Sequence, residues 1–252
     1  ELSEEQRMIQ QSVERFVDDN YDLNSRVALS SNSPGFSTEN WHSMAELGWL
    51  GLPFEEEDGG FGGNQIDVLV VMEQFGRGLV LEPYLASIVM GGGALKRGGT
   101  DALKNEILPQ VIEGTLQLAF AYAEEQSRFD LDDVMTSARK EGENFVLNGQ
   151  KSMVQNAETA DKIVVSARTS SGQVSPQGIT LFLIDADAEG LSRDNFPTVD
   201  GLRASEITLE NVSVGPDRIL GEVDQGFSIL QSVANDAMLA LSAEAVGAME
   251  VL

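Results

Sequence analysis

The sequence predicts an α+β protein with an N-terminal all-helical domain, a middle antiparallel β domain of the barrel or sandwich type, and the start of a C-terminal helical bundle. Apolar residues recur at helical spacing up to about Gly114. From Leu116 to about Val214 they alternate with polar residues, as in strands that bury one face. Helical spacing returns after Gly226. We therefore expect domains at residues 1–115, 116–222 and 223–252.

The N-terminal domain begins with a capping-box pattern at Ser3-Glu4-Glu5-Gln6, which predicts an amphipathic first helix. Further helices are expected at Ser37–Leu47, Ile66–Gly76, Glu82–Lys96 and Ala102–Ile112. Their apolar and methionine residues are interpreted as core rather than as cofactor contacts.

A glycine-rich stretch, Gly59–Gly63, lies between two of these helices. A phosphate-binding loop would need a preceding strand and a closing Lys-Ser or Lys-Thr pair, and the sequence has neither here. We interpret the stretch as a turn.

The middle domain contains a series of short strand patterns separated by turn signals. The expected strands are Leu118–Ala123, Val134–Arg139, Phe145–Leu147, Ile163–Ala167, Ile179–Asp185 and Ile207–Val212. After Leu147, an Asn-Gly pair followed by alternation over Lys151–Gln155 predicts a hairpin with a returning strand.

Composition excludes several classes of protein. With 16 Lys+Arg against 41 Asp+Glu, the formal charge of −25 would repel nucleic acid and anionic lipid. There is no cysteine, and His42 is the single histidine, so it has no partner histidine or cysteine with which to bind a metal ion. No metal site is therefore expected. No apolar run approaches the roughly 20 residues that a membrane span needs, so we expect a soluble, cytoplasmic protein without membrane partners.

Two segments of the middle domain resemble motifs of the acyl-CoA dehydrogenase family. LAFAYAEEQSRFD, from Leu118 to Asp130, is similar to the family's A-x-T-E-P-x-x-G-S-D, and LNGQKSMVQNAETAD, from Leu147 to Asp161, to its N-G-x-K-x-W-I-T-N-G. Weaker similarities follow the family's order along the chain, among them Gly48–Leu52, Asp200–Ser205, Val212–Pro216 and Ile219–Gly221.

The resemblance implies FAD as cofactor and an acyl-CoA thioester as substrate. In the family a carboxylate takes the α-proton of the thioester while the β-hydrogen leaves as hydride to the flavin. It also implies that cofactor contacts come from Tyr122, Ala123, Met153, Val154 and Gln155. The implied contacts to the CoA moiety are Phe129 and Asp130.

Several of these positions depart from the family pattern. Ala123 stands for threonine, Met153 for tryptophan, Val154 for isoleucine and Gln155 for threonine. In the first segment Arg128 and Phe129 stand for the glycine and serine of G-S-D. A lost hydroxyl and a lost aromatic ring would each remove roughly 0.5–1.5 kcal/mol of flavin binding.

These departures predict a subunit that binds FAD poorly by itself. The resemblance points to the degenerate, smaller partner of a two-subunit acyl-CoA dehydrogenase, a type that acts on bulky, dicarboxylic or steroid acyl-CoA; an ordinary homo-oligomeric dehydrogenase and a non-catalytic scaffold stay open. The sequence ends at Leu252, within what would be the first bundle helix, so no catalytic base is assigned. The apolar stripe of that helix is expected to pack on another protomer or on further sequence. Electron-transfer flavoprotein is the family's common acceptor.

Overall fold

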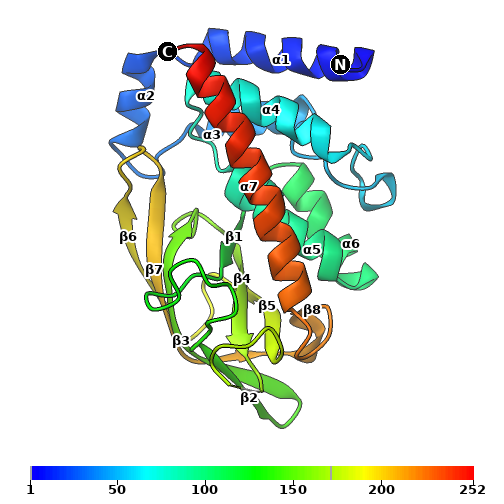
Figure 1. The fold of residues 1–252 in the computed structure, drawn as a ribbon, viewed down its shortest axis with the longest axis vertical. Helices are drawn as coiled ribbons and strands as arrows, with labels where there is room; N and C mark the ends of the chain where they lie inside the picture. The colour runs from blue at the N-terminus through cyan, green and yellow to red at the C-terminus, as the bar shows by residue number, and fades with distance from the viewer. Residues whose placement is uncertain (1, 171) are drawn as a thin grey trace.

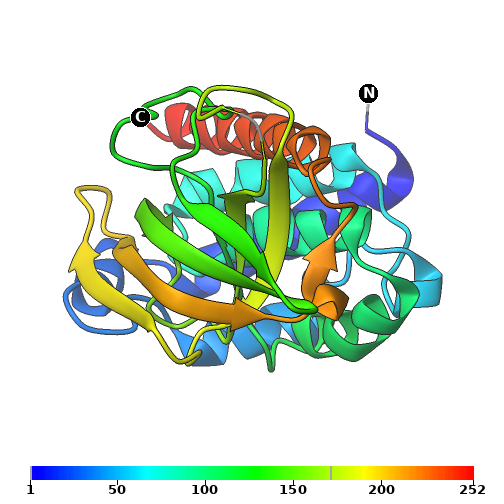
Figure 2. The same cartoon turned by 90° about the horizontal axis from the view of Figure 1, so that it is seen from below.

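The computed structural model describes residues 2–170 and 172–252, and they form a helical layer, a sheet layer and one long helix that joins the two (Figure 1). The fold class predicted from the sequence is confirmed. The helices before the sheet are α1 (Glu4–Asn20), α2 (Leu23–Ser30), α3 (Thr38–Glu46), the 3-10 turn η1 (Glu56–Asp58), α4 (Gln65–Gly78), the π-helix η2 (Tyr84–Gly92), α5 (Gly93–Gly98) and α6 (Asp101–Ile112). Seen from below, the sheet lies in front of the helices (Figure 2).

The sheet takes up the middle of the chain. Its strands are β1 (Leu118–Ala121), β2 (Ser137–Glu141), β3 (Asn144–Gln155), β4 (Lys162–Arg168), β5 (Ile179–Asp185), β6 (Leu191–Pro197), β7 (Arg203–Val214) and β8 (Ile219–Leu220). They are ordered β6-β7-β3-β2-β4-β5-β8, with β1 beside β4. Most pairings are antiparallel, while β1 and β2 run parallel to β4. A 3-10 turn, η3 (Pro216–Arg218), precedes β8, and α7 (Phe227–Glu250) ends the chain.

The capping box at Ser3 is present as predicted: its hydroxyl accepts from the backbone of Gln6, and the Gln6 side chain accepts from the backbone of Ser3. The glycine-rich stretch forms a turn, as interpreted. The N–H groups of Phe61, Gly62 and Gly63 bond to carbonyls of the preceding loop. They are therefore not available to cradle a phosphate.

The predicted hairpin at Asn148-Gly149 is wrong. β3 runs unbroken through this pair and stays paired with β7 on both sides of it, with a shift of register between Leu147 and Gly149. The pair therefore sits in an irregularity of a long strand, where glycine's φ of +154° is tolerated. The tight turn of this region instead joins β2 to β3 around Gly142, which has a φ of +62°.

Two elements had no signal in the sequence. α2 buries none of its residues, so it carries no apolar stripe that a periodicity could reveal. β6 is an edge strand with mostly exposed side chains, and its pairing with β7 alone defines it.

The strand predicted at Val134–Arg139 begins later than expected, since β2 starts at Ser137.

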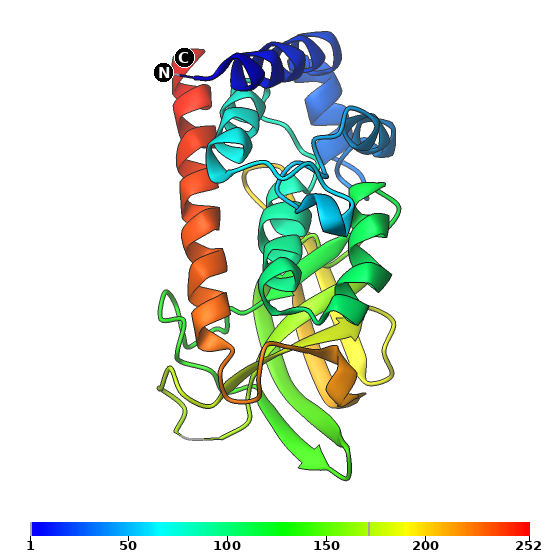
Figure 3. The same cartoon turned by 90° about the vertical axis from the view of Figure 1, so that its right-hand side faces the viewer.

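The sheet separates two apolar cores. Along β5, Leu181 and Leu183 face the helices, whereas Phe182 and Ile184 face a second core between the strands. α7 lies along the side of both layers and crosses α4 closely (Figure 3). A Cβ at Gly247 would come within 1.7 Å of the Glu73 carbonyl oxygen, so only glycine permits this crossing.

Among residues 2–170 and 172–252, no helix is long and apolar enough to cross a membrane. The same part of the chain shows no group of acidic and histidine side chains arranged to hold a metal ion. His42 is exposed on α3.

Candidate functional site

The structure brings together the two segments that the sequence assigns to the cofactor. The first continues from β1 through Tyr122 and Ala123, and the second is the last part of β3. The backbone N–H of Ser152 donates to the carbonyl oxygen of Ala123 at 2.9 Å. These segments lie apart in the sequence, and the sheet makes them neighbours.

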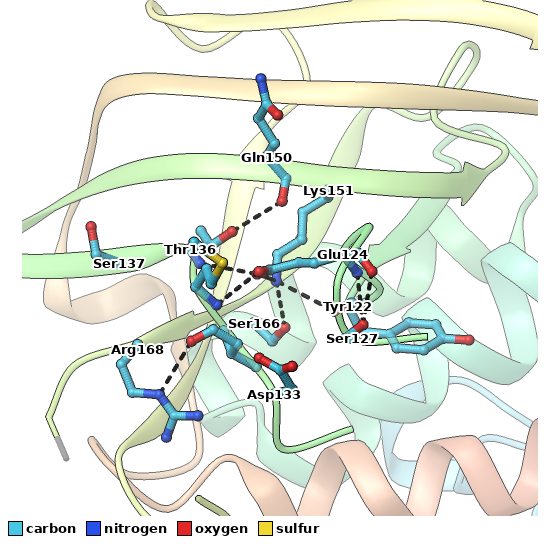
Figure 4. Close-up of polar contacts among 12 residues, drawn as sticks. Tyr122, Glu124, Ser127, Asp133, Thr136, Ser137, Gln150, Lys151, Ser166 and Arg168 are labelled. Atoms are coloured by element: carbon cyan, nitrogen blue, oxygen red, sulfur yellow. Dashed lines mark hydrogen bonds and ion pairs between the residues drawn. The ribbon is translucent and has the colours of Figure 1, made fainter. Parts of the chain in front are cut away.

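A buried ion pair fastens the two segments (Figure 4). The Lys151 ammonium on β3 lies 2.7 Å from Oε1 of Glu124, and the side chains are 0% and 3% exposed. The ammonium also donates to Oγ of Ser166 at 3.0 Å and to the Tyr122 carbonyl at 3.4 Å. Each polar atom of the pair therefore has partners, as a buried charge requires.

Glu124 also fixes the loop that follows it. Its carboxylate accepts from the backbone N–H of Met135 at 2.7 Å and of Thr136 at 3.0 Å. Thr136 in turn donates from Oγ1 to the Gln150 carbonyl of β3 and accepts at its carbonyl from the Arg168 N–H. The loop from residue 124 to 136 is thus tied to β3 and β4 at several points.

The ionisation of the pair follows from these contacts. Burial acts to raise the pKa of Glu124, but the Lys151 ammonium and the hydrogen bonds to the carboxylate outweigh it and hold the pKa at about 2. Burial lowers the pKa of Lys151 to about 8, against the opposing effect of Glu124. Both groups are therefore charged at neutral pH.

The residues predicted to face the cofactor differ in their exposure. Tyr122, Ala123 and Gln155 are half-buried, and Met153 is 55% exposed. Val154 is 2% exposed and belongs to the core between the strands, so a ligand on the surface could reach only its backbone.

Each of the two segments contains a residue with strained backbone. Arg128 and Met153 have φ values of +50° and +54°, a region that residues other than glycine and asparagine rarely adopt. Arg128 stands where the resembling motif has glycine, and the φ value gives the physical reason for glycine at that place. Non-glycine residues held in this region are often part of functional sites.

The predicted CoA contacts, Phe129 and Asp130, lie in the loop after this strained residue. Phe129 is 96% exposed, and Asp130 is exposed with its N–H donated to the Ser127 carbonyl. The loop brings Arg128 to the edge of an open cavity of about 680 Å³, but neither Phe129 nor Asp130 lines it.

This open cavity carries unused hydrogen-bond donors. It is lined by the loop and by β3, including Arg128, Gln150 and Ser152. Within the described ranges, the side chains of these three residues make no hydrogen bond or ion pair to protein. A guanidinium, an amide and a hydroxyl without internal partners suit a ligand rich in acceptors, such as one that carries phosphates.

A second cavity, of about 130 Å³, begins at the end of β3, where Gln155 and Asn156 line it. Its other walls come from α4, the start of η2, and α7. Four acidic residues line it, Glu82, Glu158, Asp200 and Glu244, and the sequence reasoning assigned none of them to a site. A signal existed for Glu82, because it is the one acid in the otherwise apolar run from Leu79 to Tyr84.

Comparison with known protein families covers most of the chain. Residues 3–115 match the family model described as acyl-CoA dehydrogenase, N-terminal domain. Residues 119–212 match the model described as acyl-CoA dehydrogenase, middle domain.

Individual relatives agree with the family models. The chain is 34% identical over 218 residues to a 3-(aryl)acrylate reductase of Clostridium sporogenes (strain ATCC 15579). The aligned residues are 84% of this chain and 57% of the reductase. The solved glutaryl-coenzyme A dehydrogenase in complex with glutaryl-CoA superposes with a TM-score of 0.90 at 25% identity, over 100% of this chain and 65% of that one. The FAD complex of PigA gives a TM-score of 0.90 at 25% identity, over 100% and 67%. The chain therefore spans somewhat more than half to about two thirds of the length of these proteins.

Proposed function

The chain belongs to the acyl-CoA dehydrogenase family, and we propose that it is a flavoprotein subunit that contributes to the α,β-desaturation of an acyl-CoA thioester together with a second subunit. The observation that carries this proposal is the joining of the two predicted cofactor segments by the Ser152–Ala123 hydrogen bond and the buried Lys151–Glu124 pair. A rigid edge built in this way can hold a ligand in one geometry, which hydride transfer requires.

The residues present fit FAD in part. Tyr122, Ala123, Met153 and Gln155 would border the ring, and Val154 would contribute backbone. The Gln155 amide can donate a hydrogen bond where the family has a threonine hydroxyl. When bound, FAD would accept the hydride that leaves the β-carbon.

The donors of the open cavity would bind the phosphates that FAD and CoA both carry. Arg128 adds a positive charge to a chain of formal charge −25, so it reduces the local repulsion of an anionic ligand. Phe129 and Asp130, on the same loop, stay our candidates for the CoA moiety. This chain's described residues supply no carboxylate that we assign as the base for the α-proton.

A second subunit is proposed on two grounds. Ala123 and Met153 lack the hydroxyl and the aromatic ring of the family motif, which at about a kilocalorie each lowers flavin affinity by one to two orders of magnitude. α7 also exposes several large apolar side chains: Met238 (57%), Leu239 (46%), Leu241 (47%), Val246 (44%) and Met249 (63%). Such a face needs cover from another protomer or from further sequence. We propose electron-transfer flavoprotein as the electron acceptor.

The alternative function is a scaffold subunit of the same family that binds no FAD by itself. The substitutions at Ala123 and Met153 favour it, while the intact ion pair and the free donors beside it favour the first proposal. The domain limits at residues 1–115, 116–222 and 223–252 are part of both proposals.

A flavin absorbance spectrum separates the two. The chain is purified alone and after co-expression with a candidate partner, and the ratio of absorbance at the flavin band to that of protein is measured for each. The first proposal expects little flavin in the chain alone, stoichiometric flavin in the complex, and reduction of a dye on adding acyl-CoA. A complex whose flavin content is unchanged when Gln155 is replaced by alanine and Arg128 by serine would favour the scaffold.

A further inference from the structure

The smaller cavity, of about 130 Å³, contains a buried carboxyl group with one oxygen that lacks a hydrogen-bond partner among the described residues. Glu82, just before η2, is 5% exposed. Its Oε1 accepts from the backbone N–H of Ser37 at 3.2 Å, which fixes the orientation of the carboxyl group. Its Oε2 is buried and has no hydrogen-bond partner among the described residues. Leaving such a polar atom unsatisfied is unfavourable, so the site is suited to a ligand that satisfies it.

The charges around the cavity add to this preference. Glu244 of α7 also lines it, and burial together with the nearby Asp200 raises the pKa of Glu244. Arg203 lines the cavity too, but its guanidinium is paired with Glu158. Neither Glu82 nor Glu244 forms an ion pair within residues 2–170 and 172–252. The cavity is therefore rich in hydrogen-bond acceptors, and no cationic side chain among the described residues neutralises Glu82 or Glu244.

Much of the remaining wall is apolar, while Gln155, Asn156 and Thr159 add polar groups. Met72 and Phe75 of α4, Tyr84 of η2 and Leu241 of α7 contribute to it. The phenol of Tyr84 donates to the Trp49 carbonyl at 3.1 Å, so it does not serve Glu82. The volume of about 130 Å³ has room for roughly five or six heavy atoms, on the scale of a cavity of about 150 Å³ that holds one benzene ring.

We propose that this cavity receives the end of a short acyl chain that carries a hydroxyl group, and that Oε2 of Glu82 is the hydrogen-bond partner of that hydroxyl. The inference rests on the proposed function, because Gln155 lines the cavity and is also a candidate cofactor contact. An acyl chain that passes Gln155 would place its reacting carbons beside the proposed cofactor site and its distal end at Glu82.

A hydroxyl suits Glu82 in either of its protonation states. Burial raises the pKa of Glu82 to about 7, so both the carboxylate and the carboxylic acid are populated at neutral pH. A hydroxyl both donates and accepts, whereas an ammonium can only donate and a plain methyl group can do neither. A site built around a buried polar group also discriminates strongly against ligands that leave the group unpaired.

The first arm of the test measures thioester binding by calorimetry in the presence of FAD. The ligands are pentanoyl-CoA, 5-hydroxypentanoyl-CoA and 5-aminopentanoyl-CoA, which share the CoA moiety and differ only at the distal end. The proteins are the wild type, Glu82→Gln, Glu82→Leu and the control Glu73→Gln. Glu73 also has a pKa raised by burial, but it does not line the cavity.

We expect the wild type to bind the hydroxy thioester roughly five- to tenfold more tightly than pentanoyl-CoA. Glu73→Gln should keep this ratio, Glu82→Gln should keep most of it because an amide also donates and accepts, and Glu82→Leu should reverse it. The same ratio in the wild type and in Glu82→Leu would overturn the inference. A preference for the amino thioester over the hydroxy thioester would overturn the assignment of a hydroxyl.

The second arm needs neither FAD nor CoA and separates the two proposals. The change in Tm caused by millimolar pentan-1-ol is compared with that caused by pentanoate in the same four proteins. If no thioester binds any of the four proteins in complex with the partner subunit, the proposed function fails. The assignment of a hydroxyl to Oε2 of Glu82 then stands without the acyl chain if pentan-1-ol raises the Tm of the wild type and Glu73→Gln relative to Glu82→Leu, and it falls if the shifts are equal.

Discussion

Replacement of Lys151 by methionine tests whether the buried ion pair holds the candidate site together. Methionine fills much the same space, so the main change is that Glu124, 3% exposed, loses its cation. The N–H groups of Met135 and Thr136 still bond to the carboxylate. We therefore expect a loss of about 3 kcal/mol in the free energy of unfolding, at the lower end of the range for breaking a buried pair. In a chain of this size, that corresponds to a fall in Tm of roughly 6–12 °C.

A double-mutant cycle measures the coupling between the two side chains. Glu124→Gln, added to Lys151→Met, removes the uncompensated charge while keeping an oxygen for the loop N–H groups. The double variant should recover at least about 1.5 kcal/mol of the loss. Urea unfolding of the wild type, both single variants and the double variant gives the four values. The control is Lys162→Met, whose pair with Asp185 is 19% and 60% exposed and should cost less than about 1 kcal/mol.

Two results would refute this reasoning. One is a loss below about 1 kcal/mol for Lys151→Met, which is the size expected of a surface pair. The other is a cycle in which the two single losses simply add, since independent sites behave in that way.

The other predictions concern packing, the cofactor and pH. Gly247→Ala should lower the free energy of unfolding by at least about 1–3 kcal/mol, measured by urea titration, because the new methyl group would meet a backbone carbonyl of α4 at 1.7 Å; an unchanged midpoint would contradict the close crossing. Ala123→Thr with Met153→Trp should raise the flavin content of the isolated chain without giving turnover, which absorbance and a dye assay check together; a fall in flavin content would count against the assigned positions. Because burial raises the pKa of Glu82 from 4.5 to about 7, the folded protein holds this proton more tightly, so wild-type stability should fall by about 3 kcal/mol between these pH values and Glu82→Gln should remove that fall. The pKa of Glu124 is instead lowered to about 2, so its contribution to stability is complete above pH 4.5 and is lost as pH falls toward 2; acid unfolding curves of Glu124→Gln, flatter in this window, check the sign.

Several features of this protein were readable from the sequence because their signals are local. The capping box at Ser3, the change of hydrophobic period at Leu116 and the turn at Gly59–Gly63 depend on residues a few positions apart. The order of helices, sheet and helix follows from the same patterns. The two motif segments were also readable, because each is a short run of chain.

Tertiary structure alone decided the features that depend on distant contacts. The Asn148-Gly149 pair predicts a turn by its local chemistry, but pairing with β7 keeps β3 continuous through it. A lysine in sequence is usually expected at the surface. In the fold, Lys151 is buried, and its ammonium bonds to Glu124, Ser166 and the Tyr122 carbonyl.

The candidate site shows the same division between sequence and structure. The sequence determined which residue types stand at the predicted cofactor segments, including the absent hydroxyl at Ala123 and the absent ring at Met153. It did not determine that Glu82 would be buried in a cavity that also contains Glu244, because Glu82 lies between α4 and η2, Glu244 lies on α7, and only the close crossing of α4 and α7 brings them together. A carboxyl group becomes an unsatisfied acceptor only when packing removes its water, and that packing is set by the whole fold rather than by the residues beside it in the chain.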